Sequence, residues 1–337
     1  MTAHHKPLKI GEVEVRPGQR VTVDLPVARL YTDTSLSMPV KVIRGRRAGP
    51  VLFISAAIHG DELNGVEIVR RLLRQKSLDS LRGTLLAVPI VNVHGFLERS
   101  RYLPDRRDLN RSFPGSAKGS IAARTASTFV KQIVSKAQFG IDLHTGALNR
   151  TNLPQVRANL DDEQTIELAR VFGAPVIISS TVRDGSLRQY AAESGFPILV
   201  YEAGEALRHD EVSIRAGLRG VIRVMRHVGM LPKARATKAV SPVVAASTSW
   251  VRAPDSGVIS HKAELGDTVV EGQTLAIVSD PLGDDQEAVR APFDGIVIGR
   301  STLPLAHEGE ALFHIAAFKS LSRAESKVEQ FTERFND

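Results

Sequence analysis

The strongest constraint on the fold is a series of short apolar runs, each followed by a segment with helical hydrophobic spacing. "PVLFISAAI" (50–58) is a continuous apolar run of strand length, and "ELNGVEIVRRLLRQ" (62–75) then places its apolar residues on one helical face. The alternation recurs around "FGIDLHTG" (139–146) and "FPILVYEAGE" (196–205). Continuously apolar strands fit a sheet that is covered on both faces. The sequence therefore predicts an α/β fold with a mixed sheet flanked by helices.

The C-terminal third of the chain has a different pattern. Composition shifts within 231–248, and beyond it short strand-like segments alternate with Gly/Asp turns. "APDSGVI" (253–259) returns as "APFDGIV" (291–297), which indicates an internal repeat of one hairpin unit. We expect a large domain over 1–235, a small all-β barrel or sandwich module over 243–318, and a charged tail over 319–337.

Composition narrows the classes of function. The chain of 337 residues contains no cysteine, so a metal ion would be held by histidines and carboxylates. Aromatic residues make up only 5% and are not interleaved with basic runs, which argues against nucleic acid as a partner. The sequence has no run long enough to span a membrane and no apolar leader at its start. We therefore expect a cytoplasmic protein with no membrane partner.

Charge is unevenly distributed. Up to residue 235, 35 Lys and Arg stand against 22 Asp and Glu, whereas acidic residues dominate the remainder. This asymmetry is compatible with two solvated surfaces, with docking between the two parts, or with an anionic small-molecule substrate.

Three of the predicted strands end on polar residues that could bind a metal. The pattern H-x-x-E occurs three times, but only "HGDE" (59–62) directly follows an apolar strand, whereas 261–264 and 307–310 lie in turns of the β module. His144 and Glu202 end two further apolar strands. In open α/β sheets ligands bind outside the carboxyl ends of strands, so we expect these side chains on one rim.

His59, Glu62 and His144 form a three-ligand zinc set that leaves a fourth position for water, the pattern of catalytic zinc sites. In this interpretation Glu202 is no ligand but the general base that later protonates a leaving amine. Asp142 precedes His144 by two residues, so both side chains lie on the same face of a strand. It is a candidate hydrogen-bond partner for the ligand histidine.

A second polar stretch, "SRYLPDRRDLNRSFPG" (100–115), reads as a loop rich in arginine. Arginine binds carboxylates in a bidentate manner and can stabilise an oxyanion near a metal. The alternative is an exposed basic loop in which Asp108 pairs with an arginine. The chain lacks the G-x-S-x-G, Walker, dinucleotide-binding and H-E-x-x-H motifs.

Four motifs together resemble the succinylglutamate desuccinylase/aspartoacylase family, relatives of the zinc carboxypeptidases. They are "HGDELNG", "DLNRSFPG", "DLHTG" and "YEAGE", in the order of the family. The resemblance implies a zinc-carboxypeptidase-like fold, one zinc ion per chain held by His59, Glu62 and His144, and Glu202 as the catalytic carboxylate.

The resemblance also implies roles for substrate-binding residues. Asn110 and Arg111 match the pair that holds the substrate carboxylate, and Arg101 matches the arginine that polarises the scissile carbonyl. The stretch before "DLNR" is longer than in aspartoacylases, so Arg106 or Arg107 remains an alternative to Arg101. Arg157, in "NLPQVRANL" (152–160), lies where the family lines its pocket and is implied to contact the substrate.

The β module resembles the C-terminal domain of the family, which is similar to a biotinyl/lipoyl carrier barrel. A carrier needs a lysine at a hairpin tip, and the matching turn "SDPLGDDQE" (279–287) has none. We therefore expect neither lipoylation nor biotinylation.

The sequence as a whole predicts a zinc-dependent amidohydrolase of the deacylase or desuccinylase type. It would cleave the amide bond of a small N-acyl amino acid or a related compound that carries a carboxylate. The alternatives are a zinc carboxypeptidase acting on peptides and a non-catalytic binding protein on a hydrolase scaffold. The resemblance leaves a homo-oligomer open.

Overall fold

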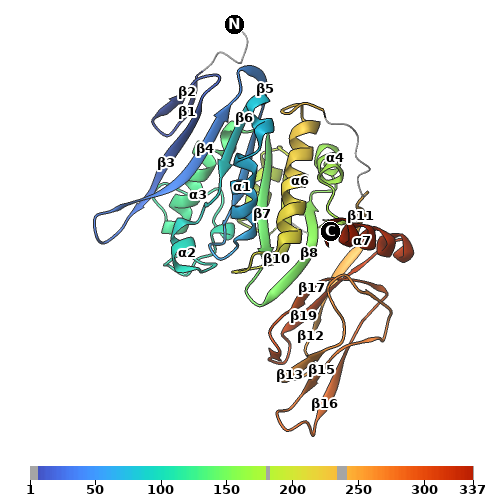
Figure 1. Ribbon diagram of the computed structural model, residues 1–337. Coiled ribbons are helices and arrows are strands. Elements are labelled where there is room, and N and C mark those ends of the chain that lie inside the picture. Colours follow the sequence, from blue (N-terminus) through green and yellow to red (C-terminus); the bar gives the residue numbers. More distant parts are fainter. Residues whose placement is uncertain (1–6, 180–182, 234–240, 337) are drawn as a thin grey trace.

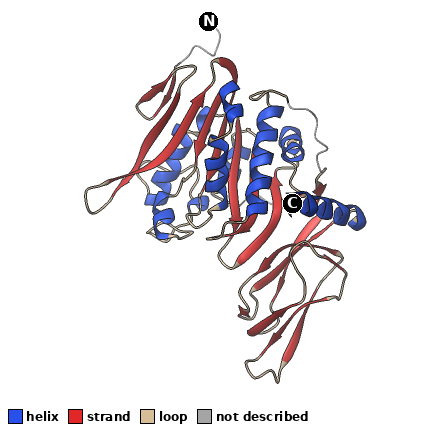
Figure 2. Cartoon of the chain, viewed as in Figure 1, coloured by secondary structure: helices blue, strands red, loops and turns tan. Residues whose placement is uncertain are grey.

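The computed structural model describes residues 7–179, 183–233 and 241–336. A mixed sheet with helices on both faces forms the larger part, and a β module extends from one end of it (Figures 1 and 2). The predicted α/β architecture is confirmed.

The larger part contains β1 to β10 and α1 to α6. Its strands are β1 (Leu8–Ile10), β2 (Val13–Val15), β3 (Arg20–Arg29), β4 (Ser35–Arg44), β5 (Arg47–Ala56), β6 (Arg82–Val88), β7 (Phe139–Gly146), β8 (Arg150–Ala158), β9 (Val176–Ser179) and β10 (Ile198–Glu205). Its α-helices are α1 (Asn64–Leu73), α2 (Val93–Glu98), α3 (Ile121–Gln132), α4 (Glu163–Phe172), α5 (Leu187–Glu193) and α6 (Glu211–His227). Short 3-10 turns lie at Lys76–Ser80, Leu109–Arg111 and Val134–Lys136.

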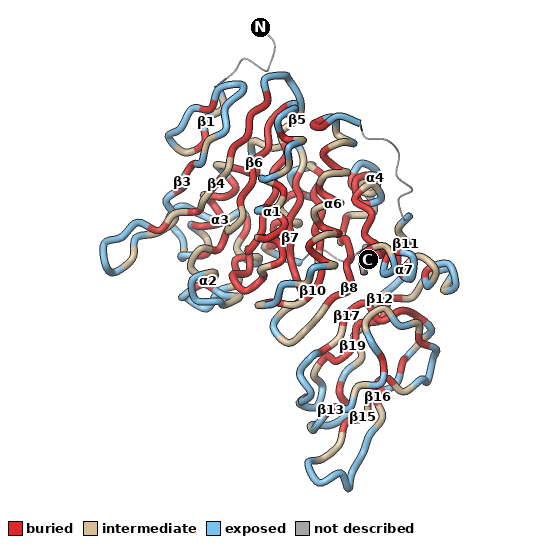
Figure 3. The backbone as a smooth tube through the Cα atoms, in the orientation of Figure 1, coloured by how far each residue is buried: buried red, intermediate tan, exposed pale blue. Residues whose placement is uncertain are grey.

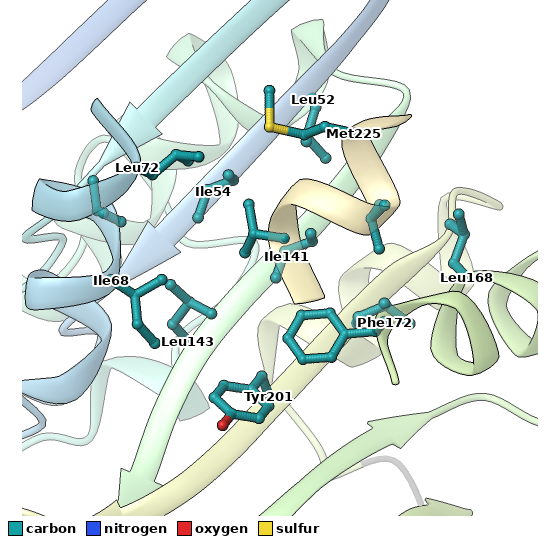
Figure 4. Packing of buried hydrophobic residues seen from close by; sticks show 14 of the residues in the cluster. Leu52, Ile54, Ile68, Leu72, Ile141, Leu143, Leu168, Phe172, Tyr201 and Met225 are labelled. Atoms are coloured by element: carbon teal, nitrogen blue, oxygen red, sulfur yellow. The ribbon is translucent and has the colours of Figure 1, made fainter. Parts of the chain in front are cut away.

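The centre of the sheet has the strand order β8-β10-β7-β5-β6-β4-β3. Strand β7 pairs in parallel with both β5 and β10, and β7, β10 and the second half of β5 are largely buried (Figure 3). One face of these strands packs against α1, α4 and α6, with Leu72, Phe172 and Tyr201 in the shared core (Figure 4). The opposite face packs against α3 and α5. Among the described residues, no helix combines the length and apolarity that a membrane span requires.

The sequence pattern predicts one strand over 83–95 and several short strands joined by polar turns over 8–47, and the structure differs from both predictions. The run 83–95 is not one strand, because β6 ends before Pro89 and the Asn92 side chain caps α2 by accepting from Gly95 N. Residues 8–47 form two short strands, β1 and β2, followed by the long hairpin β3–β4 rather than several short strands.

The C-terminal module is continuous with the large sheet. Its strands are β11 (Val243–Val244), β12 (Ser247–Arg252), β13 (Gly257–His261), β14 (Thr268–Val269), β15 (Thr274–Ser279), β16 (Gln286–Arg290), β17 (Gly295–Ser301), β18 (Leu305–Ala306) and β19 (Ala311–Ala317). β17 pairs with β8, and β19 and β12 extend the sheet from there, whereas β16, β15, β13 and β18 form a second sheet. The composition shift within 231–248 predicts a linker, but part of this segment is strand, because β11 pairs with β9.

The charged tail is an amphipathic helix, α7 (Leu321–Asn336). Ala324 and Val328 pack against β17, while Phe331 and Phe335 pack against Ala216 of α6. The helix therefore contacts both the β module and the larger part. The domain boundaries themselves stay a prediction.

We predict that Leu72→Ala lowers the free energy of unfolding by about 2–5 kcal/mol, because it removes a fully buried side chain and leaves a cavity. The matched control is Leu282→Ala, at a position that is 83% exposed, which should change stability by less than about 0.5 kcal/mol. Denaturant unfolding of both variants measures the difference. Equal effects would mean that the core around α1 is packed differently.

Candidate metal and active site

Three neighbouring parallel strands bring the predicted residues to one edge of the sheet. Glu202 of β10 lies opposite His144 of β7 in the strand register, so both side chains face the same side. β5 is the other neighbour of β7 and ends three residues before His59. The predicted common rim is confirmed, since His59, His144 and Glu202 all line one cavity of about 830 Å³.

His59, Glu62 and His144 form a compact group of side chains that could hold a metal ion. Their candidate ligand atoms all lie within 4.8 Å of one another, and all three residues are buried. The two carboxylate oxygens of Glu62 each lie 2.7 Å from a histidine Nδ1, Oε1 from His59 and Oε2 from His144.

The turn that carries His59 and Glu62 is held against α2. Glu62 N donates to His59 O across the turn. A Cβ on Gly60 would lie 2.0 Å from the backbone carbon of Gly95, so only glycine allows this close approach. The helix α1 begins at Asn64, and Glu62 therefore belongs to the turn rather than to the helix.

Two further carboxylates orient the histidine rings. Asp142 Oδ2 lies 2.7 Å from His144 Nε2, and Ser55 Oγ donates to the other oxygen of Asp142. Asp108 Oδ1 lies 3.2 Å from His59 Nε2. With its proton on Nε2, each histidine ring donates to its outer carboxylate. The lone pair on Nδ1 of each ring then faces Glu62. The donor set and its outer partners therefore fit a zinc ion.

The electrostatics also favour a cation at this position. Burial lowers the pKa of His59 and His144, but Glu62 and the outer carboxylates outweigh burial and raise both pKa values. Burial raises the pKa of Glu62, yet the two histidines hold it well below its usual range. Three buried or half-buried carboxylates thus surround two histidines, and positive charge between them is stabilised.

Glu202 lies at the edge of this group and is held from one side. Arg157 Nη2 lies 3.0 Å from Glu202 Oε2, and Asn152 Nδ2 donates to the same oxygen at 3.1 Å. Glu202 is not one of the three clustered candidate ligands. Its carboxylate lines the cavity beside them.

Only some residues of the arginine-rich loop line the cavity. Arg101 lines the cavity, with Nη1 3.6 Å from Glu62 Oε1 and Nη2 2.9 Å from Asp108 Oδ2. Asn110 and Arg111 also line it. Arg106 and Arg107 are exposed and absent from the lining, which favours Arg101 over both alternatives.

A comparison with known protein families matches the part of the chain that carries these residues. Residues 48–228, more than half of the chain, match the catalytic domain of succinylglutamate desuccinylase/aspartoacylase. The chain belongs to this family.

Three similar proteins illustrate the relationship. The chain is 27% identical over 295 residues to N-alpha-acetyl-L-2,4-diaminobutyric acid deacetylase from Halomonas elongata, covering 84% of this chain and 86% of the relative. The product-bound ectoine utilization protein EutE from Ruegeria pomeroyi superposes with a TM-score of 0.82, at 25% identity over 94% of this chain and 100% of that one. A succinylglutamate desuccinylase/aspartoacylase from Rhodobacter sphaeroides shares the fold, with a TM-score of 0.80 and 23% identity over 90% and 97%.

Within the motif "DLNRSFPG", Asp108 pairs with Arg101, as the alternative interpretation of this loop predicts, and it also contacts His59. Several cavity residues of this desuccinylase/aspartoacylase family member lie outside the motifs. The C-terminal module supplies Thr248, Trp250, Arg252 and His314 to the cavity wall. The uneven distribution of charge, for which docking between the two parts is one explanation, is the sequence signal that bears on this wall.

We predict that His59→Ala and His144→Ala each lose zinc, because each removes one of three candidate ligands. The controls are His261→Ala and His307→Ala, which disrupt the two other H-x-x-E patterns but lie in the β module. Zinc per chain is measured by atomic emission after dialysis. Comparable zinc loss from the control variants would overturn the assignment.

Proposed function

We propose that this chain is a zinc-dependent amidohydrolase that cleaves the linear amide bond of small N-acyl amino acids. One observation carries the proposal: a buried His/Glu/His set and a separate carboxylate, Glu202, face the same cavity. The deacetylase activity named for the Halomonas elongata relative supports it.

When bound by His59, Glu62 and His144, a zinc ion supplies Lewis-acid activation of a water molecule and of the acyl carbonyl group. Glu202 accepts the proton of the attacking water and passes it to the departing amine. Arg157 and Asn152 hold Glu202 through Oε2, which fixes the carboxylate at the cavity wall.

The proposed roles of the loop residues follow from their contacts. Arg101 presents its guanidinium beside Glu62, where it can stabilise negative charge on the carbonyl oxygen. Asn110 Oδ1 accepts from Leu187 N, so its Nδ2 group remains as a donor toward the cavity. With Arg111 it can hold the substrate carboxylate.

The shape of the cavity favours a small substrate over a peptide. A volume of about 830 Å³ lies within the usual range for small-molecule sites. Strand β12 and His314 of the C-terminal module wall off one side of it. This supports the deacylase over the carboxypeptidase.

The resemblance of the module to a biotinyl/lipoyl carrier, the cytoplasmic location and a homo-oligomeric state stay predictions.

A hydrolysis screen of the zinc-loaded protein tests the proposed function. N-acetyl, N-succinyl and N-formyl derivatives of acidic, basic and diamino acids should be compared with dipeptides by measuring amine release. We expect turnover of at least one N-acyl amino acid to exceed that of every dipeptide. Faster cleavage of dipeptides would identify a peptidase, and a protein that binds no zinc would instead be a binding module.

We predict that Glu202→Gln lowers kcat by ~10²–10⁴-fold, because the amide cannot accept a proton. Zinc content should stay near that of the wild type, since Glu202 is not one of the clustered ligands. The matched control is Glu205→Gln, on the same strand but outside the cavity lining, which should keep its kcat. A zinc-loaded Glu202→Gln enzyme with normal kcat would remove Glu202 from the mechanism.

A further inference from the structure

A bulge in β8 brings Asn152 onto the side of the sheet that faces the cavity. The partner of Glu202 in β8 is Gln155, and two residues later along β10 the partner is Asn152, although these two partners lie three positions apart. The extra residue in β8 is a bulge, and bulges re-aim side chains beside active sites. Strict alternation would place the apolar Leu153 on the face of Gln155, whereas the bulge lets Asn152 line the cavity. The contact of Asn152 Nδ2 with Glu202 Oε2, at 3.1 Å, therefore depends on the local path of β8.

A second bulge lies beside the first, in β17 of the C-terminal module. β17 advances by two residues, from Val297 to Gly299, where its partner β19 advances by one, so β17 carries an extra residue. Gly299 then lies directly opposite Asn152 in the antiparallel pairing of β17 with β8. Side chains of directly opposed residues point to the same face of a sheet. A side chain at position 299 would therefore point to the amide of Asn152.

The space beside this amide depends on glycine at position 299. A Cβ there would lie 2.8 Å from Asn152 Oδ1, a distance that Cβ atoms essentially never show. The next neighbours are farther away, with His314 Cβ at 3.3 Å and Thr151 O at 3.5 Å. The backbone itself does not require glycine, because Gly299 is not among the residues with positive φ. The closest contact is with the end of a side chain, so an added methyl group would displace the amide rather than the strands.

We propose that Gly299 is a positioning residue for Glu202, because it leaves room for the amide of Asn152, and that the C-terminal module thereby takes part in the reaction. The inference rests on the proposed function, in which Glu202 moves the proton. Asn152 and Arg157 both donate to Oε2 of Glu202, so two contacts on one side hold the carboxylate. Of these two contacts, displacement of the amide leaves only that of Arg157, about which the carboxylate can turn. A general base must lie within hydrogen-bond reach of the proton that it takes, so such a turn lowers the rate.

The positioning role is tested with Gly299→Ala, Asn152→Ala and the double variant, and with Gly272→Ala as the matched control. Gly272 lies in a turn of the same module, outside the cavity lining, and a Cβ there would meet nothing within 4 Å. Its φ is 81°, so alanine at this position destabilises the backbone without reaching the site. For each zinc-loaded protein, kcat and KM are measured with the N-acyl amino acid that the wild type cleaves fastest. Zinc content and denaturant unfolding are measured in parallel.

We expect Gly299→Ala and Asn152→Ala each to lower kcat by about 10- to 100-fold, because a small displacement of a catalytic group has an effect of this size. KM and zinc content should stay near those of the wild type. The double variant should have the kcat of Asn152→Ala, because the added methyl group acts only by displacing the amide. Gly272→Ala should lose stability and keep its kcat.

Three results would overturn the positioning role. They are a normal kcat in either single variant, effects of the two substitutions that multiply in the double variant, and a comparable fall in kcat for Gly272→Ala. If Gly299→Ala does not fold, the double variant decides, because alanine at position 152 removes the close contact. A folded double variant with the kcat of Asn152→Ala supports the inference, and an unfolded one means that the methyl group acts on other neighbours.

Crystal structures of the wild type and of Gly299→Ala separate this inference from the proposed function. If the wild type cleaves no amide, but the amide of Asn152 leaves Glu202 in the variant, the hydrolase proposal fails and the structural dependence on Gly299 stands. If Asn152 keeps its contact with Glu202 in the variant, the inference is wrong whatever the outcome of the hydrolysis assay. If the wild type cleaves an amide and the variant keeps both its kcat and the contact, the proposed function stands without this role for Gly299.

Discussion

The parallel register of β5, β7 and β10 is the constraint on which the site depends. Side chains alternate between the faces of a strand, so a slip of one residue between β10 and β7 would turn Glu202 away from His144. The register is fixed by the apolar residues before the rim, since Ile141 and Leu199 must enter the same core beneath α1 and α6. Packing of the sheet therefore determines the geometry of the polar residues at its edge.

From that edge, a continuous series of contacts between polar and charged side chains connects the residues of the site. It runs from Arg101 through Asp108 to His59, across Glu62 to His144, and ends at Asp142, which accepts from Ser55. Each histidine lies between an inner and an outer carboxylate. Because these groups are buried, each depends on its partners to offset its own desolvation. The arrangement orients the atoms that would hold the proposed ion.

The sequence predicted the parts of the site whose signals are local. His59, His144 and Glu202 each follow an apolar run, and the parallel alternation of strands implied that such ends would meet. The contact of Asp108 with His59 and that of Asn110 with Leu187 depend on the path of the loop 100–115, which hydrophobic periodicity does not encode. The sequence pattern also predicted several short strands in place of the long β3–β4 hairpin, because polar residues within these two strands resemble turns.

The C-terminal module acts on the site through the sheet that it extends. Strand β17 pairs with β8 at Asn152, and a Cβ on Gly299 would lie 2.8 Å from Asn152 Oδ1. The absence of a side chain at Gly299 thus leaves room for the amide that donates to Glu202. The next strands of the same sheet carry His314 and Trp250 to the cavity wall. One pairing therefore couples the module both to the residue proposed to move the proton and to one wall of the cavity.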